Sequence, residues 1–332
     1  MTTSKHPAKP RVIITRELAD SNQDRMCELF DAVPNLEDRE FSRDDLITAM
    51  ADCDVLVPTV TDQIDAEMIE QAPDRLKLIA SFGAGVDHID LTAARAKKIM
   101  VTNTPGVFTE DTADMTMAMI LSVPRRLAQG EKIMRSGEWT GWRPGGMLGH
   151  CIGGKKLGII GMGRIGQAVA RRASGFGMST FYHNRRQLPP AVEESLNANY
   201  IADLDTLIRE CDIISLHCPH TEETHEMINA ERIKAMKPTA YIINTARGDL
   251  IDEDALIKAL QEENIGGAGL DVYRQEPNVD PRLLDLKNTV LLPHMGSATF
   301  EGREASGERV IANIRVWADG HRPPDQVLEG WV

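Results

Sequence analysis

The stretch Lys156-Leu-Gly-Ile-Ile-Gly-Met-Gly-Arg-Ile-Gly-Gln167 decides the fold. Its apolar start, 156–160, predicts a buried strand, and the amphipathic segment 167–173 predicts a helix. In the glycine pattern between them, the first glycine permits a tight turn, the second lets the backbone approach a ligand, and the third lets the helix pack on the strand. Strand, glycine turn and helix in this order predict a dinucleotide-binding loop, with the phosphates at Gly161, Gly163, Arg164, Ile165 and Gly166.

Short apolar runs alternate with amphipathic segments along most of the chain. The pattern predicts helices over 44–50, 65–71 and about 298–320, the last with Val310, Ile311, Ile314 and Trp317 facing inward. Strands that alternate with helices form parallel sheets covered by helices on both faces, so we predict an α/β protein with doubly wound sheets. The predicted strands are 11–15, 54–58, 76–80, 156–160, 178–182, 211–216, 240–243, 267–271 and 289–292.

Composition limits the classes of function that remain open. The 332 residues suffice for two domains, and the net charge of −13 argues against a nucleic-acid or anionic-membrane surface. No apolar run approaches the about 20 residues that span a bilayer, and residues 1–10 lack the apolar core of a signal peptide. Five scattered cysteines without CxxC spacing predict reduced thiols, a cytoplasmic location, and neither a metal site nor a disulfide framework.

The end of the strand after the glycine loop bears on the choice of cofactor. NAD sites usually carry an acidic residue about 20 positions beyond the glycines, where it binds the ribose 2′-hydroxyl. Here the strand ends in Tyr182-His-Asn-Arg-Arg186, and residues 174–187 contain no acid. Asn184, Arg185 and Arg186 therefore favour the 2′-phosphate of NADP over NAD. A solvated basic turn beside a site that accepts both cofactors is the alternative.

Three polar residues follow the last three predicted strands. Arg247 follows 240–243, Glu276 follows 267–271, and His294 follows 289–292. Ligands of open parallel sheets bind beyond the carboxyl ends of the strands, so we expect these side chains to converge. Each alone is more often structural. Together they match reduction of a 2-keto acid by hydride: His294 donates the proton, Glu276 stabilises its imidazolium, and Arg247 binds and polarises the substrate.

Ordered motifs across most of the chain resemble one enzyme family, the D-isomer-specific 2-hydroxyacid dehydrogenases. Within it, the sequence is most similar to glyoxylate and hydroxypyruvate reductases. The motifs are Ser81-Phe-Gly-Ala-Gly-Val-Asp87, Asn103-Thr-Pro-Gly106, Gly161 to Gly166, His217-Cys-Pro219, Asn244-Thr-Ala-Arg-Gly-Asp249, Gly269-Leu-Asp-Val272, Glu276-Pro277 and Pro293-His-Met-Gly296.

The resemblance implies roles for further residues. It makes Arg247, Glu276 and His294 the catalytic set, and it assigns the substrate carboxylate to the backbone amides of Ala84 and Gly85. The remaining cofactor contacts that it implies are Thr112, His217, Cys218, Pro219, Thr245, Ala246, Asp271 and Gly296, with Asp271 near the nicotinamide amide.

The resemblance also implies a domain layout and a partner. A Rossmann cofactor domain, 105–296, is inserted into a flavodoxin-like substrate domain formed by 1–104 and 297–332. Members of the family are typically homodimers. The segment Trp142-Arg-Pro144 resembles one that reaches toward the partner subunit's substrate site, so Trp142 is expected to contact substrate.

Several related readings remain open. Formate dehydrogenases of this architecture pair the histidine with glutamine, and Glu276 argues against that branch. A D-3-phosphoglycerate or D-lactate type dehydrogenase is a closer alternative. A nucleotide-sensing, corepressor-like binding protein is the alternative outside catalysis, although binding alone would not require Arg247, Glu276 and His294.

Overall fold

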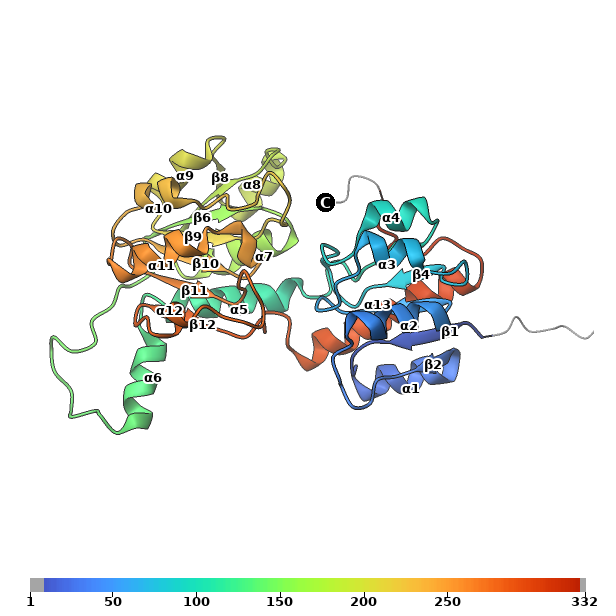
Figure 1. Ribbon diagram of the computed structural model, residues 1–332. Helices are drawn as coiled ribbons and strands as arrows, with labels where there is room; N and C mark the ends of the chain where they lie inside the picture. Colours follow the sequence, from blue (N-terminus) through green and yellow to red (C-terminus); the bar gives the residue numbers. More distant parts are fainter. Residues whose placement is uncertain (1–8, 329–332) are drawn as a thin grey trace, which may run out of the picture. The chain divides into compact units, whose positions relative to one another are not determined.

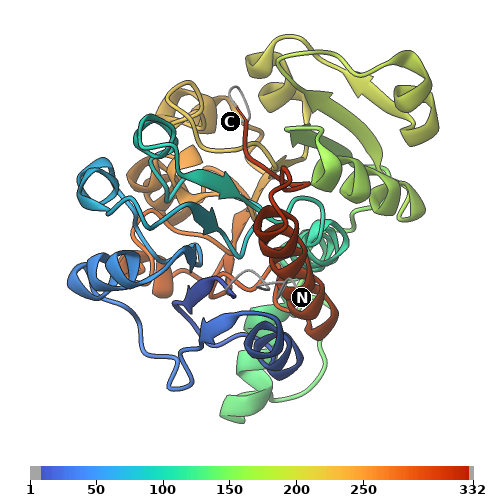
Figure 2. The ribbon, with the colours of Figure 1, turned by 90° about the vertical axis from the view of Figure 1, so that its right-hand side faces the viewer.

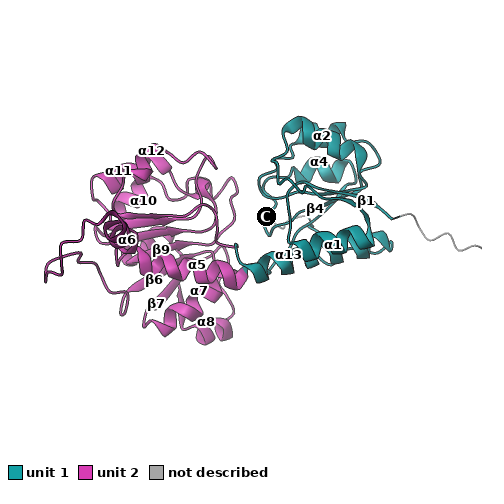
Figure 3. Cartoon of the chain, turned by 90° about the horizontal axis from the view of Figure 1, so that it is seen from below, with its two compact units in different colours: residues 1–108, 298–332 teal, residues 109–297 magenta. Residues whose placement is uncertain are grey.

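The computed structural model describes residues 9–328 and divides the chain into two compact units. Unit 1 comprises Met1–Phe108 and Ala298–Val332, and unit 2 comprises Thr109–Ser297 (Figure 3). The termini, 1–8 and 329–332, lie outside the described residues, and with them most of the segment judged for a signal peptide. Within the described part of the chain, no helix is long and apolar enough to cross a membrane.

Unit 1 is built on a five-stranded parallel sheet in the order β2-β1-β3-β4-β5 (Figure 1). The chain reverses its direction of winding between β1 and β3, which is the flavodoxin-like arrangement. The elements are β1 (Arg11–Ile14), α1 (Asp20–Leu29), β2 (Asp31–Val33), α2 (Arg43–Asp52), β3 (Val55–Val57), α3 (Ala66–Gln71), β4 (Leu78–Ala80), α4 (Leu91–Ala96), β5 (Met100–Thr102) and α13 (Phe300–Ala318).

Two apolar layers cover the sheet of unit 1. Helices α2, α3 and α4 bury Met50, Met68 and Ala94 against one face. Helices α1 and α13 lie side by side on the other (Figures 2 and 3), where Val310, Ile311 and Ile314 are buried and Trp317 is partly buried. The predicted inward face of the last helix is therefore confirmed, and α13 ends two residues before Gly320, which has a φ of +79°.

Unit 2 contains a seven-stranded parallel sheet in the order β12-β11-β10-β9-β6-β7-β8. Its winding reverses between β6 and β9, as in Rossmann folds. The elements are α5 (Thr109–Ser122), α6 (Leu127–Ser136), β6 (Lys156–Ile160), α7 (Arg164–Gly175), β7 (Ser179–His183), α8 (Pro190–Leu196), β8 (Ala198–Tyr200), α9 (Leu204–Glu210), β9 (Ile213–Leu216), α10 (Ala230–Ala235), β10 (Tyr241–Asn244), the 3-10 turn η1 (Gly248–Leu250), α11 (Glu253–Gln261), β11 (Gly267–Leu270), α12 (Pro281–Leu284) and β12 (Thr289–Leu291).

Helices on both faces enclose the core of unit 2 (Figure 3). Helices α5, α7 and α8 pack on one face, and α9, α10, α11 and α12 pack on the other. The expectation of two parallel, doubly wound α/β domains is thus confirmed. Helix α6 differs from the others, because none of its residues is buried and it extends away from the rest of the unit (Figure 1).

Candidate functional site

The glycine loop of unit 2 meets the steric demands of a dinucleotide site. Gly161 has a φ of +96°, and a Cβ there would lie 2.6 Å from the amide nitrogen of Cys218. A Cβ on Gly166 would lie 2.4 Å from the carbonyl oxygen of Gly161, whereas a Cβ on Gly163 would meet nothing within 4 Å. The outer glycines are therefore required by packing, while the middle one borders open space. Helix α7 starts there without a side-chain cap, so its first N–H groups fit a pyrophosphate.

The end of β7 is tied to the glycine loop by a side chain. Asn184 Oδ1 accepts a hydrogen bond of 2.8 Å from the backbone N–H of Met162. Because this carbonyl oxygen is engaged, the amide group of Asn184 offers N–H donors for further bonds. Arg185 and Arg186 follow on the exposed turn. The hydrogen bond between Asn184 and the loop was not predicted from the sequence.

His294 and Glu276 form a direct pair at the carboxyl edge of the same sheet. His294 Nδ1 lies 2.6 Å from Glu276 Oε2, and each side chain is 34% exposed. The other carboxylate oxygen of Glu276 accepts the backbone N–H of Tyr273 at 3.0 Å. Both oxygens of Glu276 are thus engaged, and the contact with His294 uses Nδ1, one of the two ring nitrogens.

Arg247 influences the same carboxylate. Burial alone would raise the pKa of Glu276, but the hydrogen bond and charge of His294, the Tyr273 N–H and the charge of Arg247 outweigh it and lower that pKa. The turn that carries Arg247 is braced by the buried Asn244, whose side chain donates to the Arg247 carbonyl at 2.8 Å and accepts from Ala246 N–H at 3.0 Å.

A buried carboxylate supports the turn that carries His294. His294 has a φ of +52°, a left-handed conformation that costs free energy in a residue other than glycine. Its N–H donates to the carbonyl of Asp271 at 2.8 Å. The next two N–H groups, of Met295 and Gly296, donate to the two carboxylate oxygens of Asp271 at 2.8 and 2.7 Å. Burial raises the pKa of Asp271 despite these bonds.

The other expected cofactor contacts of unit 2 lie in α5 or follow β9 and β10. Thr112 is buried in α5, and Thr116 of the same helix lies 2.9 Å from Thr245, oxygen to oxygen. Burial lowers the pKa of His217 to about 3 and raises the pKa of Cys218 to about 11. At neutral pH His217 is uncharged and Cys218 is a thiol, so neither brings charge to this edge of the sheet.

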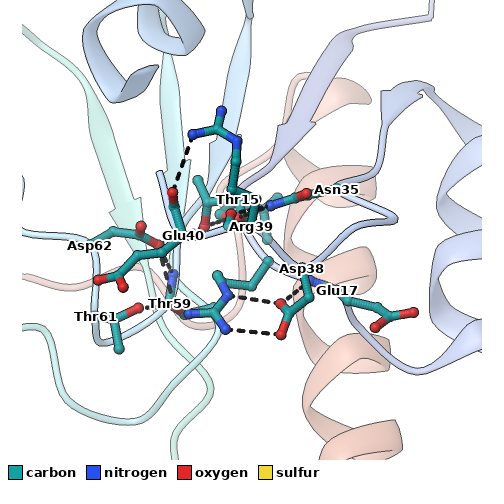
Figure 4. Close-up of polar contacts among 11 residues, drawn as sticks. Thr15, Glu17, Asn35, Asp38, Arg39, Glu40, Thr59, Thr61 and Asp62 are labelled. Atoms are coloured by element: carbon teal, nitrogen blue, oxygen red, sulfur yellow. Dashed lines mark hydrogen bonds and ion pairs between the residues drawn. The ribbon is translucent and has the colours of Figure 1, made fainter. Parts of the chain in front are cut away.

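Ala84 and Gly85 belong to unit 1, in the loop after β4. Phe82, the second residue of this loop, pairs with Thr59 in a parallel bridge. Thr59 is fixed in turn by the buried Asp62, whose Oδ2 accepts Thr59 N–H at 2.7 Å and the Thr15 hydroxyl at 2.6 Å (Figure 4). Ala84 is exposed between the buried Gly83 and Val86, so the loop offers its backbone to a ligand.

Trp142 lies in the segment that follows α6. It is 82% exposed, and Trp139 on the same segment is 59% exposed. The expected contact of Trp142 with substrate stays a prediction.

Known proteins share both the sequence and this architecture. Residues 117–296 match the family described as D-isomer specific 2-hydroxyacid dehydrogenase, NAD binding domain. A glyoxylate reductase of Thermococcus litoralis is 47% identical over 96% of this chain and 97% of its own length. A putative D-isomer specific 2-hydroxyacid dehydrogenase from Polaromonas has a TM-score of 0.90 at 38% identity, covering 97% of this chain and 100% of its own.

A further solved structure is an NADPH-dependent glyoxylate/hydroxypyruvate reductase from Sinorhizobium meliloti, in complex with NADP and malonate. It has a TM-score of 0.85 and 33% identity, covering 97% of this chain and 98% of its own. The match to the family extends over more than half of the chain, and the relatives extend over nearly all of it. This chain belongs to the D-isomer-specific 2-hydroxyacid dehydrogenases, nicotinamide-dependent oxidoreductases.

Proposed function

We propose that this dehydrogenase reduces glyoxylate or hydroxypyruvate to the 2-hydroxy acid, with D stereochemistry where a stereocentre forms. The contact of 2.6 Å between His294 Nδ1 and Glu276 Oε2 carries the proposal, because a carboxylate-paired imidazole at a strand end is suited to protonating a developing alkoxide. The names of the relatives from Thermococcus and Sinorhizobium support the choice of substrate.

The residues of this chain would supply the proton and the positive charge for the reaction. When bound, the reduced nicotinamide supplies the hydride that adds to C2 of the keto acid. His294 holds the proton on Nε2 and donates it to the C2 oxygen, while Glu276 stabilises the imidazolium before the transfer. Arg247 lowers the energy of the negative charge that develops on this oxygen. His294 is left neutral and regains a proton from solvent.

The loop after β4 would bind the acid group of the substrate. We assign the substrate carboxylate to the backbone N–H groups of Ala84, which is exposed, and Gly85, which is partly exposed. Consecutive backbone amides form concave binding sites for anions without adding a charged side chain. The assignment accounts for a loop whose flanks are buried and whose centre is exposed.

We further propose NADPH as the preferred cofactor. Asn184 presents donors because its oxygen is bound to Met162, and Arg185 and Arg186 add positive charge at the same strand end. A 2′-phosphate accepts hydrogen bonds at all its oxygens, so a set made of donors suits it better than it suits a 2′-hydroxyl. Glu223 opposes this preference, because it is a negative charge close to Arg185. The pKa of Glu223 is lowered first by the hydroxyl of Thr221 and more weakly by the charge of Arg185.

We propose a homodimer formed through α6 and the segment up to Leu148. In a single chain six large apolar side chains of this segment are exposed, and large exposed apolar surfaces mark protein interfaces. The adjoining groove, of about 780 Å³, is lined by Val123, Tyr241 and Leu286. The exposed residues are Leu127, Met134, Trp139, Trp142, Met147 and Leu148. The free cysteines accord with a reducing compartment, and we propose the cytoplasm.

Replacing His294 tests the catalytic assignment. The wild-type enzyme should oxidise NADPH with glyoxylate and with hydroxypyruvate, and His294→Ala should lower kcat by roughly 10²–10⁴-fold, as expected for loss of a general acid. His321→Ala, at an exposed position after α13, is the control. Absence of turnover with any 2-keto acid would refute the enzymatic proposal, and an unchanged kcat in His294→Ala would refute the role of this residue.

Gly248→Ala tests the backbone around Glu276 and Arg247 without replacing a charged side chain. The new Cβ would lie 2.1 Å from the carbonyl carbon of Tyr273, whose N–H holds Glu276. Displacing that backbone should cost about 1–3 kcal/mol of stability and lower kcat/KM by roughly tenfold or more. Thermal unfolding and steady-state kinetics measure both, with Gly175→Ala as the control because a Cβ there meets nothing within 4 Å. A variant with normal kcat/KM would mean that the Tyr273 contact is dispensable.

Asn184→Asp tests the cofactor preference. The carboxylate can still accept the Met162 N–H, but its second oxygen would repel a 2′-phosphate and accept a ribose hydroxyl. The ratio of kcat/KM for NADPH to that for NADH should fall by roughly tenfold or more. Asn199→Asp introduces the same charge on the neighbouring strand β8 and should leave the ratio unchanged. A wild-type enzyme that prefers NADH would contradict the proposal directly.

Sedimentation tests the homodimer. The wild-type protein should sediment as two copies of the 36.7 kDa chain. Trp139→Asp combined with Met134→Asp should shift it toward monomer, because two charges would be buried without partners. Leu36→Asp, at an apolar residue of unit 1 that is 70% exposed, is the control. A monomeric wild-type protein at micromolar concentration would rule the proposal out.

A further inference from the structure

Two carbonyl groups of the loop after β4 are fastened by neighbouring donors. The backbone N–H of Thr104 donates to the Gly83 carbonyl at 2.9 Å. The side-chain Nδ2 of Asn103 donates to the Ala84 carbonyl at 2.7 Å. Both donors come from the segment that follows β5, the strand next to β4 in the sheet.

These two bonds determine where the loop amides point. In a trans peptide the C=O of one residue and the N–H of the next point in opposite directions. Fastening the Gly83 carbonyl therefore turns the N–H of Ala84 away from the Thr104 side. Fastening the Ala84 carbonyl does the same for the N–H of Gly85. Two successive N–H groups are thus directed to the opposite side of the loop, as an anion-binding site requires.

We propose that Asn103 is a positioning residue for substrate: by holding the Ala84 carbonyl, it directs the Gly85 N–H to the substrate carboxylate. The inference rests on the proposed function, which assigns that carboxylate to the Ala84 and Gly85 amides. Asn103 itself does not touch the substrate in this arrangement. It acts through the orientation of one peptide group.

The surroundings of Asn103 hold it in place. Its side chain is buried, with the residue 4% exposed. Its N–H donates to the Asp325 carbonyl and its carbonyl accepts Asn313 Nδ2, each at 3.3 Å. Asp325 is bound in turn to Arg309 of α13 at 2.6 Å. The C-terminal part of the chain thereby fixes the backbone from which the Asn103 amide reaches the loop.

The chemistry of the position limits what could replace asparagine. The anchor must be a neutral donor, because a carboxylate would face the Ala84 carbonyl and repel it. The partner anchor at Gly83 is a backbone N–H, so it survives substitutions of Thr104 other than proline. Loss of the Asn103 amide should therefore release one of the two loop peptides and leave the other in place.

Asn103→Ala provides the kinetic test. We expect the KM for glyoxylate to rise about tenfold to a hundredfold, the effect of one hydrogen bond to a charged group, with kcat and the KM for NADPH nearly unchanged. Asn35→Ala is the matched control, because Asn35 Nδ2 also donates to a carbonyl of unit 1, that of Thr15, at 2.8 Å. An Asn103→Ala enzyme with a wild-type KM for glyoxylate overturns the inference, as does an equal rise in Asn35→Ala.

Binding of oxamate, an unreactive carboxylate, separates this inference from the proposed function. Isothermal titration with the NADPH-loaded protein should show weaker oxamate binding in Asn103→Ala, by a factor that matches the change in KM. In the wild-type protein, labelled at alanine and glycine, the amide resonances of Ala84 and Gly85 should shift when oxamate is added. This measurement needs no variant to fold and no turnover. Unshifted resonances overturn the inference even in an active enzyme, and shifted resonances without turnover support it while rejecting the proposed reaction.

Discussion

The buried carboxylate of Asp271 is the contact on which the candidate catalytic edge depends. Together with its own backbone carbonyl, it binds three consecutive N–H groups, those of His294, Met295 and Gly296. These bonds offset the free-energy cost of holding a histidine at a φ of +52°. Because Asp271 directly follows β11 and His294 follows β12, the pairing of these two adjacent strands determines where the imidazole of His294 lies.

In both units hydrogen bonds hold the turns and loops at the strand ends, but the chemical groups that these turns and loops present differ. In unit 2 the ends of three neighbouring strands carry charged side chains, and buried polar residues such as Asn244 and Asp271 brace the turns between them. In unit 1 residues 82–86 of the loop after β4 have no charged side chain, and hydrogen bonds hold the carbonyl groups of Gly83 and Ala84 so that amides remain available. Charge is thus placed where a reaction would develop it, and neutral dipoles where an anion needs only to be bound.

The sequence predicted the parts of the fold that rest on regular patterns. The strand over 156–160 and the glycine turn after it were predicted to the residue, because apolar runs and glycines report local geometry. The strand β2 was missed, since its three residues are partly or fully exposed and show no buried pattern. The strand β8, also of three residues, was missed because only Ala198 of the three is buried, and one buried residue makes no pattern.

The candidate site likewise has a part that the sequence predicted and a part that it did not. That Arg247, Glu276 and His294 follow adjacent strands could be read from the sequence, and the contact between the last two agrees with that reading, although their roles stay predictions. The supports could not be read: Asn103 reaches a carbonyl 19 residues away, and Asn184 an N–H 22 residues away. Such side chain to backbone contacts leave no periodic signal, because they depend on where two loops meet in space. These supporting hydrogen bonds therefore become apparent only in the structure.

The return of the chain to unit 1 has a consequence for biosynthesis. The apolar layer on one face of its sheet includes Val12 and Val55 from the N-terminal part and Val310, Ile311 and Ile314 from α13. A ribosome completes all of unit 2 before it adds these last residues. During translation one face of the earlier-made sheet is covered by α1 but not yet by α13, while the later-made unit already has every residue of its core. The domain that begins the protein is thus the last to be finished, and truncation near the C-terminus would damage the N-terminal domain first.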